Sequence, residues 1–410
     1  MTPYRSLLLR TLRIISFLLI VFARFSWIPL FSASAADKPD FETLTQSGYE
    51  HYYNLEYDQA IRDFQKALEA RPNDPKAINH LLEAELFQAL YNHNALDTGM
   101  YTKQRFLSGK PVPLDPTVKK GLMELAQRAM AASDKRLRTS PGDLQALYSR
   151  GVTQGLQSTY LAVAEHSFWA ALRHALAARK DHEEVLKRQP NFADAKTVVG
   201  AHEYVVGSLS APVKVMVGIV GVRGDKNKGL RMLAEAGKAG GESSMDANVA
   251  LALFLRREQR YQEAIDVVRA LTRERPHNFL FALEEGNLMR DAGRGPESIA
   301  SYRLLLSGCK EGRYPSAHSE VAQYALGEAL RGQDLLPEAL EAYQAAAASS
   351  GYDPDLHQRA LLGAGEVSDL LSRRSDAVAE YRAAIALDSS TEEAGVARKY
   401  LNRPYQGGRR

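Results

Sequence analysis

Residues 326–349 read LGEALRGQDLLPEALEAYQAAAAS, and their small and aromatic residues follow a spacing that recurs along the chain. Gly327, Ala339, Tyr343 and Ala346 stand at offsets of 0, 12, 16 and 19 residues. The same offsets return, the last time partly eroded, in three other sets: Gly365, Ala377, Tyr381, Ala384; Gly48, Ala60, Phe64, Ala67; and Gly286, Ser298, Tyr302, Leu305. Small residues let two antiparallel helices approach closely, and the aromatic ring fills the gap towards the next pair. The spacing therefore predicts stacked helix hairpins.

This four-position pattern resembles the tetratricopeptide repeat, a helical repeat with a period of about 34 residues. The resemblance covers residues 41–92 and 245–391. It implies an all-α fold, a right-handed α-solenoid of antiparallel helix pairs with a diverged central helical region. The first helix of each pair, the A helix, would line a concave groove in which a protein or peptide docks in extended or helical form.

The resemblance also implies which side chains face that groove. Arginine and tyrosine are common interface anchors, so Arg331, Tyr324 and Arg359 are the preferred candidates. For each residue the alternative is a solvated helix face. The lysine–asparagine clamp with which some repeats of this family hold a peptide carboxylate is absent from these positions, which argues against a receptor for chaperone tails. The full predicted set is Asn287, Arg290, Tyr324, Glu328, Arg331, Arg359, Glu366 and Asp369.

The positions of prolines and glycines along the chain predict how it is divided into segments. Residues 143–189 contain no proline and are long for one helix, so we expect a division or a bend near Gly151–Gly155. The apolar, glycine-interleaved segment 208–224 is interpreted as a buried connector, with membrane contact as the alternative. The predicted parts are a signal peptide (1–35), an N-terminal repeat unit (36–92), an insertion loop (93–117), a diverged helical region (118–242), a C-terminal array with a terminal capping helix (243–403) and a flexible tail (404–410).

The first residues predict export. A basic start precedes the apolar run Ile14–Ala23, and Ala33-Ser34-Ala35 follows as an Ala-x-Ala site, so cleavage is expected before Ala36. An uncleaved anchor is the alternative, but the apolar run is far shorter than the ~20 residues that cross a bilayer. With its repeats and leader, the chain resembles exported bacterial tetratricopeptide-repeat proteins without an assigned reaction. We therefore expect a periplasmic or cell-envelope location.

Charge and cysteine content exclude several classes of function. The formal net charge is +3, but residues 1–35 carry four arginines and no acidic residue, so the remainder has 48 basic side chains against 49 acidic ones. Such a balance argues against a nucleic-acid partner, which requires a basic face. Cys309 is the only cysteine, which excludes an intramolecular disulfide and a cysteine-rich zinc site.

No catalytic motif stands out. His202 and Glu203 begin a zinc-protease-like stretch, but position 206 is Val where that motif needs histidine. His166, His174 and His182 recur every eight residues, and eight steps of ~100° overshoot two whole turns by about 80°. These three histidines therefore do not form one ligand stripe. We expect no catalytic residue, no metal and no cofactor.

The leading hypothesis is a non-enzymatic protein-interaction scaffold of the cell envelope that binds a protein or peptide in the groove of its C-terminal array. One alternative is a membrane-associated assembly factor that docks peripherally through residues 208–222 or the leader. Another is a hydrolase or metal-dependent enzyme that uses His166, His174 and His202. The sequence predicts neither the identity of the partner nor the oligomeric state.

Overall fold

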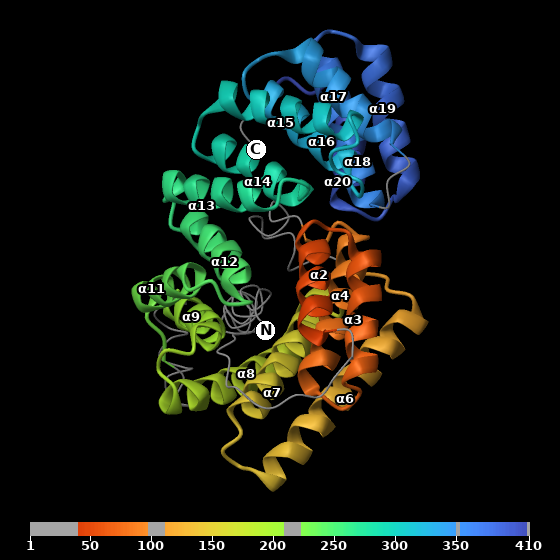
Figure 1. The fold of residues 1–410 in the computed structure, drawn as a ribbon. Coiled ribbons are helices and arrows are strands. Elements are labelled where there is room, and N and C mark those ends of the chain that lie inside the picture. The colour runs from red at the N-terminus through yellow and green to blue at the C-terminus, as the bar shows by residue number, and fades with distance from the viewer. Residues whose placement is uncertain (1–39, 97–110, 209–222, 350–352, 408–410) are drawn as a thin grey trace, which may run out of the picture. The chain divides into compact units, whose positions relative to one another are not determined.

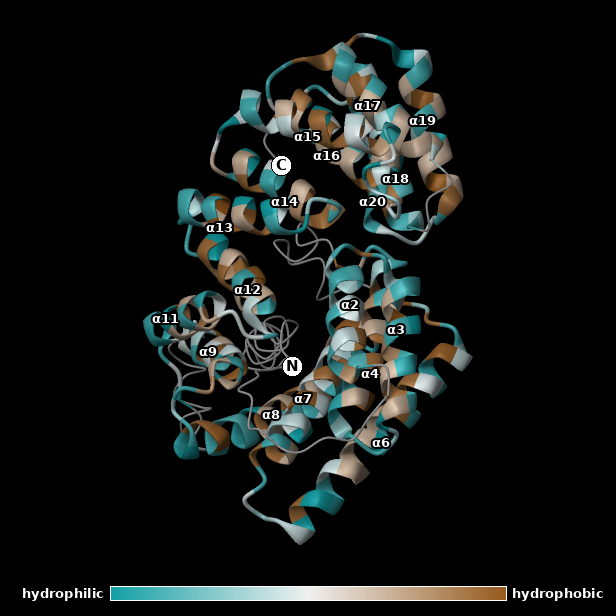
Figure 2. Cartoon of the chain, viewed as in Figure 1, coloured by the Kyte–Doolittle hydropathy of each residue, from teal (hydrophilic) through white to brown (hydrophobic). Residues whose placement is uncertain are grey.

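A computed structural model describes residues 40–96, 111–208, 223–349 and 353–407. The regular structure in these ranges is helical, without strands, and consecutive helices pack as antiparallel pairs (Figure 1). The all-α, repeat-like fold class predicted from the sequence is confirmed. Among the described residues, no helix combines the length and the apolar character that crossing a membrane requires. Most helices carry both hydrophobic and hydrophilic residues (Figure 2).

The chain divides into two compact units, one up to Val267 and the other from Val268 onwards. The boundary falls inside helix α13 (Tyr261–Glu274). The sequence analysis placed the start of the C-terminal array at residue 243, so the compact units do not follow that boundary. Because each unit has its own core, we describe the two separately.

In the described residues of the first unit the helices form four consecutive pairs. α2 pairs with α3, α4 with α6, α7 with α8, and α9 with α11, and α12 packs on α11. The helices span Phe41–Tyr53 (α2), Tyr57–Ala70 (α3), Pro75–Tyr91 (α4), Pro116–Thr139 (α6), Leu144–Thr159 (α7), Phe168–Arg188 (α8), Ala193–Gly207 (α9), Lys226–Lys238 (α11) and Ser244–Arg257 (α12). The region predicted as diverged thus also contains paired helices.

The second unit continues with three helix pairs and a final single helix. α14, α16 and α18 are the A helices, and α15, α17 and α19 are their partners, the B helices. The helices span Phe279–Asp291 (α14), Gly295–Lys310 (α15), Ser319–Arg331 (α16), Leu336–Ala348 (α17), Pro354–Leu370 (α18), Arg374–Leu387 (α19) and Glu392–Asn402 (α20). α20 packs on α19 and covers the end of the stack.

The contact between glycine and aromatic ring that the spacing predicts is present. A Cβ atom on Gly48 would lie 2.4 Å from Phe64 Cε1, and one on Gly365 would lie 2.5 Å from Tyr381 Cε1. Tyr343 lies between two glycines: a Cβ on Gly327, in its own pair, or on Gly363, in the next pair, would come within 2.9 Å of its ring. The ring therefore fills the gap between neighbouring pairs, as predicted.

The turns after α2, α12, α14, α16 and α18 share one geometry. In each, a residue with positive φ follows the helix, and the next N–H group donates to a carbonyl five residues back, as in a Schellman cap. Asp334, for example, has φ 56°, and the N–H of Leu335 donates to the carbonyl of Leu330 at 3.0 Å. In these five turns the residues with positive φ are Leu55, Gln259, Gly293, Asp334 and Ser372, of which one is glycine.

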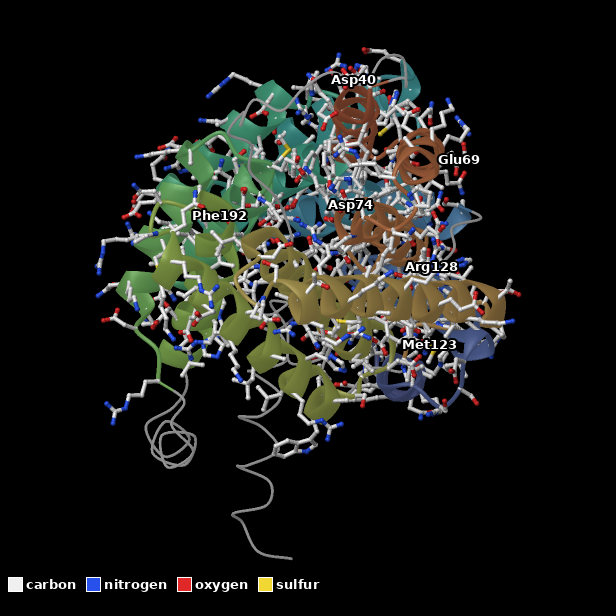
Figure 3. The ribbon with its side chains drawn as sticks, turned by 60° about the horizontal axis from the view of Figure 1, so that its bottom comes forward. Asp40, Glu69, Asp74, Met123, Arg128 and Phe192 are labelled. Carbon is white, nitrogen blue, oxygen red and sulfur yellow. The ribbon has the colours of Figure 1, made fainter. Side chains whose placement is uncertain are left out.

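Aspartates cap several helices of the first unit. The carboxylate of Asp74 accepts the N–H of Lys76 at 2.9 Å, and Pro75 occupies the first turn of α4 (Figure 3). Asp115 caps α6 in the same way, with Pro116 as its first residue. The predicted insertion loop therefore ends at Asp115 rather than at residue 117. Met123, which Figure 3 shows on α6, is exposed.

The central helices correct a second expectation. α7 runs straight past the glycines at which a division was expected, and the chain breaks only after a π-helical turn at Tyr160–Ala164, where His166 has φ 50°. Gly151 is retained inside the helix because His182 packs onto it: a Cβ there would lie 2.4 Å from the His182 ring. Close packing, not a helix break, explains that glycine.

Several predicted segments lie partly or wholly outside the described residues. The signal peptide falls entirely outside, as do residues 97–110 of the insertion loop and residues 209–222 of the apolar segment. The C-terminal tail is different. It was predicted to be flexible from residue 404, but Tyr405 is only 8% exposed and packs on the second unit.

Candidate functional site

The eight predicted groove residues all lie on the A helices α14, α16 and α18 of the second unit. The structure divides them into two groups. One group bonds inward to the repeat's own buried side chains, and the other lies towards the surface. The division matters because a residue held by a buried partner cannot be reassigned to an external ligand without loss of stability.

Acceptors for buried tyrosine hydroxyls form the inward group. The hydroxyl of Tyr302 donates to Asn287 Oδ1 at 2.7 Å, and that of Tyr343 donates to Glu328 Oε1 at 2.5 Å. In each case the acceptor directly follows the glycine against which the ring packs. Burial and the Glu328 carboxylate raise the pKa of Tyr343 well above its usual value. Asn287 and Glu328 therefore complete the repeat, which the prediction of groove residues missed.

The third tyrosine follows the same rule with a shifted acceptor. The hydroxyl of Tyr381 donates to Asp369 Oδ2 at 2.9 Å, one helical turn after the glycine. Glu366, which directly follows Gly365, is fully buried and accepts from Arg331 Nη1 at 2.6 Å instead. Arg331 and Glu366 thus tie α16 to α18. Removing one partner of such a buried pair leaves an uncompensated charge.

Tyr324 and Arg359 form the surface-directed pair. The Arg359 guanidinium lies 5.2 Å from the centroid of the Tyr324 ring, and that ring lies 5.7 Å from the ring of Tyr343. Both residues are half-buried, with Asp353 Oδ2 4.0 Å from Arg359. Burial raises the pKa of Asp353. The structure therefore brings together two of the three preferred anchors, whereas the third, Arg331, contacts the C-terminal tail.

Arg290 lies in the last turn of α14, as Arg331 does in α16. It is half-buried, and its Nε lies 3.9 Å from Asp291 Oδ1 on the same helix. It lies on a different helix from Tyr324, on α16, and from Arg359, on α18. The predicted set therefore forms a row across three helices rather than one cluster.

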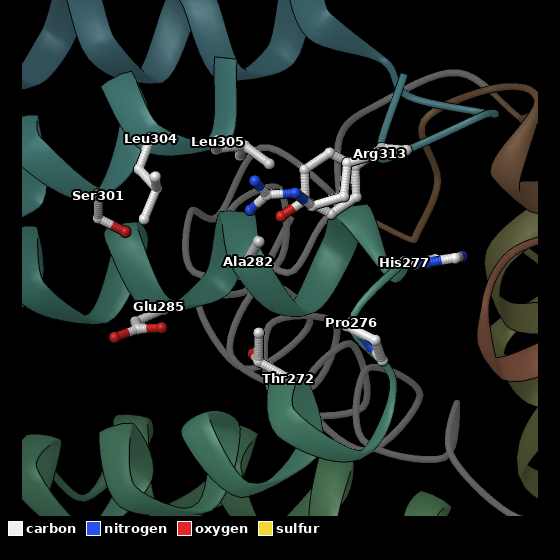
Figure 4. A pocket seen from close by; sticks show the side chains of 10 residues that line it. Thr272, Pro276, His277, Ala282, Glu285, Ser301, Leu304, Leu305 and Arg313 are labelled. Atoms are coloured by element: carbon white, nitrogen blue, oxygen red, sulfur yellow. The ribbon is translucent and has the colours of Figure 1, made fainter. Parts of the chain in front are cut away.

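A pocket beside α14 and α15 was not predicted from the sequence. It encloses about 460 Å³, and its wall includes the end of α13 and the loop before α16 (Figure 4). Leu304, 64% exposed, lies at this pocket, and Arg269 bonds Glu285 in its wall at 2.7 Å. The lining residues are Thr272, Pro276, His277, Ala282, Glu285, Ser301, Leu304, Leu305, Arg313 and Tyr314.

The first unit contains a buried polar cluster that sequence reasoning also missed. Lys76 Nζ donates to Glu242 Oε1 at 3.2 Å, and the hydroxyl of Tyr53 donates to the Glu242 carbonyl at 3.4 Å. His80 Nε2 lies 3.6 Å from Glu242 Oε2. Burial lowers the pKa of Lys76, and the Glu242 carboxylate opposes that effect. Glu242 lies more than 160 positions after Tyr53, Lys76 and His80, so no local sequence motif predicts this contact.

The histidines of the enzyme hypothesis occupy different environments. His174 Nδ1 lies 2.5 Å from Gln154 Oε1, whereas His202 is buried with its Nε2 3.3 Å from Arg179 Nη1. Burial and the charge of Arg179 lower the pKa of His202 to about 3. Within the part of the chain that the structure describes, no group of three or more His, Cys, Asp or Glu residues is placed to hold a metal ion.

Several solved structures are similar to the chain at low identity. A tetratricopeptide repeat protein from Parabacteroides merdae is 12% identical with a TM-score of 0.35, covering 78% of this chain and 98% of its own. Yeast Tom70 is 11% identical (TM-score 0.40; 89% and 88% covered). The human IFIT1 dimer with m7Gppp-AAAA is 11% identical (TM-score 0.43; 98% and 88% covered). These scores carry no inference about a ligand.

Sequence comparison matches one part of the chain to a family. No curated protein matches the chain. The family described as "Tetratricopeptide repeat" matches residues 223–279 and 249–318, a range that joins the end of the first unit to the beginning of the second. This match agrees with the helix pairs and with the contacts between glycine and aromatic ring described above. Residues 223–318 of this chain are therefore similar to the tetratricopeptide-repeat family.

Proposed function

We propose that this chain is a non-enzymatic scaffold of the cell envelope that binds a protein or peptide partner on the A helices of its second unit. The observation that carries the proposal is the pair formed by Arg359 and Tyr324, a cation stacked on a half-buried aromatic ring. Arginine and tyrosine supply rigid, amphipathic contact area and are enriched among residues that dominate binding energy.

The family supports the coarser part of this proposal, because tetratricopeptide repeats are typical of protein-interaction scaffolds. The row of groove residues supports the finer part. Asn287 and Glu328 hold buried tyrosine hydroxyls, so we assign partner contact to Arg290, Tyr324 and Arg359 instead. An extended or helical peptide laid along α14, α16 and α18 would meet these side chains in sequence.

A paired set of charge reversals tests this binding face. Arg290→Glu with Arg359→Glu is compared with Arg373→Glu plus Arg382→Glu, whose arginines are exposed at the start of and along the B helix α19. Both double variants change the net charge by the same amount. Partners are recovered from an envelope extract and quantified against the wild type. We expect at least tenfold lower recovery only with the first variant; equal recovery with both would refute the assignment of the face.

Location is tested separately. We propose that residues 1–35 direct export and are removed, on the basis of the apolar run and the Ala-x-Ala site in the sequence. Intact-mass measurement of the protein purified from the envelope fraction should give a chain that begins at Ala36. A chain that retains its leader in the membrane fraction would favour the anchored alternative, and recovery from the cytoplasm would contradict export.

A further inference from the structure

The segment after α20 folds back onto the A helices of the second unit. Pro404 cannot continue the helix, and the chain leaves α20 without regular structure. Tyr405 follows and is only 8% exposed. At Gly407, which has φ 87°, an added Cβ would lie 3.8 Å from Leu370 Cδ2, at the end of α18. The tail therefore runs from α20 back across α18.

Tyr405 is held by charged and aromatic groups from α16, α18 and α20. Arg331 Nη2, on α16, donates to the Tyr405 hydroxyl at 2.8 Å, and the guanidinium lies 5.1 Å from the centroid of its ring. The backbone N–H of Tyr405 donates to Asp369 Oδ2, on α18, at 2.8 Å. The ring of Tyr400, on α20, meets that of Tyr405 edge-on, with centroids 5.2 Å apart.

These receiving groups are fixed by other partners. Arg331 also bonds the fully buried Glu366 at 2.6 Å. Asp369 also accepts from Arg374 Nη1, at 2.9 and 3.1 Å from its two oxygens, and from the Tyr381 hydroxyl. If the tail left, Arg331 would keep Glu366 and Asp369 would keep Arg374, so neither buried charge would lose its counterion. The site is pre-organised, and emptying it leaves no orphaned charge.

We propose that Arg331, Asp369 and Tyr400 form a recognition site for a tyrosine in an extended peptide segment, and that residues 404–407 are its resident occupant. A segment of a partner protein with a tyrosine in extended backbone displaces the tail. This inference rests on the proposed function and specifies the chemistry of its ligand. The site reads the ring by a cation over its face, the hydroxyl by a charged donor, and the backbone by a carboxylate.

Tethering explains how a short tail can occupy the site. A segment attached by a few residues has an effective concentration in the millimolar range, so a weak intrinsic affinity suffices for occupancy. A competing segment then binds with an apparent affinity reduced by the fraction of sites that the tail leaves open. The tail thereby sets a threshold, and only a partner with a better segment or with further contacts exceeds it.

The experiment measures binding of a labelled, end-capped peptide Arg-Pro-Tyr-Gln-Gly to full-length proteins by fluorescence anisotropy. The wild type is compared with Tyr405→Ala, which empties the site. We expect binding at least tenfold tighter to Tyr405→Ala than to the wild type, and no binding of a peptide with alanine in place of tyrosine. Tyr405→Phe keeps the ring but loses the hydroxyl, so it should give an intermediate apparent affinity.

Each other outcome decides against the proposal. Equal binding to wild type and Tyr405→Ala, or binding to neither with melting curves that show both proteins folded, would make Tyr405 a structural cap only. A melting curve that shows Tyr405→Ala unfolded would lead to the same conclusion if Tyr405→Phe then binds no more peptide than the wild type. A concentration-dependent dimer of the wild type that Tyr405→Ala abolishes would assign the site to a second copy.

The proposal and the function on which it rests can fail independently. The recovery experiment changes Arg290 and Arg359, which are not among the residues assigned to the tyrosine site. Loss of the partner in that experiment with no peptide binding here would refute the tyrosine site alone. Peptide binding here with unchanged partner recovery there would refute the assigned face alone.

Discussion

The first helix pair of the first unit and the three pairs of the second unit each pack an aromatic ring against a glycine at the same position of the repeat. They differ in whether the outer end of that ring carries a hydroxyl group. Phe64 is apolar throughout and lies among other rings, with Tyr49 at 4.9 Å and His80 at 5.4 Å. Tyr302, Tyr343 and Tyr381 carry hydroxyls and need an acceptor on the A helix. The same packing of a ring on a glycine therefore occurs in two electrostatic versions, one with an apolar phenylalanine and one with a tyrosine whose hydroxyl needs an acceptor.

The difference shows which polar residues on an A helix are available for binding. A tyrosine in the ring position commits one acceptor on the A helix to the interior, since an unpaired buried hydroxyl is costly. A phenylalanine frees that position, and the first pair has Tyr49 there. His182, packed on Gly151 in the first unit, is a third version with a titratable ring. The predictions below test these versions, from the largest expected effect to the smallest.

Removing the ring should have the largest effect. Phe64→Ala deletes a fully buried ring between α2 and α3, and we expect the free energy of unfolding of the first unit to fall by about 3–5 kcal/mol. Denaturant unfolding followed by circular dichroism measures it. Trp169→Ala removes a larger ring that is 56% exposed and should change the stability by no more than about 0.5 kcal/mol. Similar losses in the two variants would contradict the assigned packing.

The histidine version should make the first unit sensitive to acid. Burial lowers the pKa of His182 to about 4, whereas the unfolded chain takes up this proton near its usual value of 6.5. The unfolded state therefore binds more protons in this window, so stability falls as the pH drops from about 6.5 towards 4. We expect a loss of about 2–3 kcal/mol from this residue.

His182→Phe is the control for that pH dependence. It keeps a ring against Gly151 but removes the titrating group, so the loss between pH 6.5 and 4 should be smaller by the contribution of His182. His202, whose pKa is also lowered by burial and by Arg179, contributes to the slope in both proteins. Denaturant midpoints at several pH values provide the comparison, and identical slopes would show that His182 is not held neutral.

Filling the glycine should disturb the contact from the other side. In Gly365→Ala the new Cβ would lie 2.5 Å from Cε1 of Tyr381, a fully buried ring whose hydroxyl is bonded to Asp369, so we expect a loss of about 1–3 kcal/mol. Gly395→Ala, in α20, has open space for its Cβ and should instead gain up to ~1 kcal/mol from helix propensity. Thermal unfolding should therefore shift in opposite directions, and shifts of the same sign would contradict this.

Exchanging the two electrostatic versions tests the acceptor rule. Tyr302→Phe leaves the Asn287 carbonyl oxygen without its donor and should cost about 1–2 kcal/mol. Adding Asn287→Leu removes the acceptor as well, but it also removes the Asn287 Nδ2 donor to Glu284 Oε2 at 3.4 Å, so it should restore only part of that loss. The reverse exchange, Phe64→Tyr, should cost about 1–3 kcal/mol in the first pair. A neutral Phe64→Tyr would show that the first pair tolerates a hydroxyl after all.

The turns within the pairs offer the smallest effect. Ser372 has φ 59°, a conformation that costs a non-glycine residue roughly 1 kcal/mol, so Ser372→Gly should stabilise the second unit by about 0.5–1 kcal/mol. Gly293→Ala, at φ 75° in the corresponding turn, should destabilise it by a similar amount. The same two melting curves decide both statements.

How much of the fold and of the site could be predicted depends on how far apart in the sequence the interacting residues lie. The contact between glycine and ring acts between residues 16 apart, and Gly48 with Phe64 or Gly365 with Tyr381 could be read directly. The acceptor rule was also readable, because the acceptor follows the glycine at Asn287 and Glu328, but we assigned these residues to a groove. A tyrosine in the ring position was the available signal.

Other features had no local signal. Lys76 and Glu242 are brought together by the stacking of several pairs, and no periodicity specifies that contact. Tyr405 follows a proline near the end of the chain, a context that usually frays, and only Arg331 and Asp369 explain its burial. Gly151 was predicted to break a helix because its packing partner, His182, is 31 residues away and not in the repeat's spacing.

Tyr343, enclosed by Gly327 on one side and Gly363 on the other, belongs to two helix pairs at once. No boundary between these pairs can be cut without exposing a ring that one of them needs. Excision or duplication of genetic material in this part of the chain must therefore preserve the ring together with both glycines. A crossover between them would produce two incomplete helix hairpins, each of which lacks part of the packing around the Tyr343 ring.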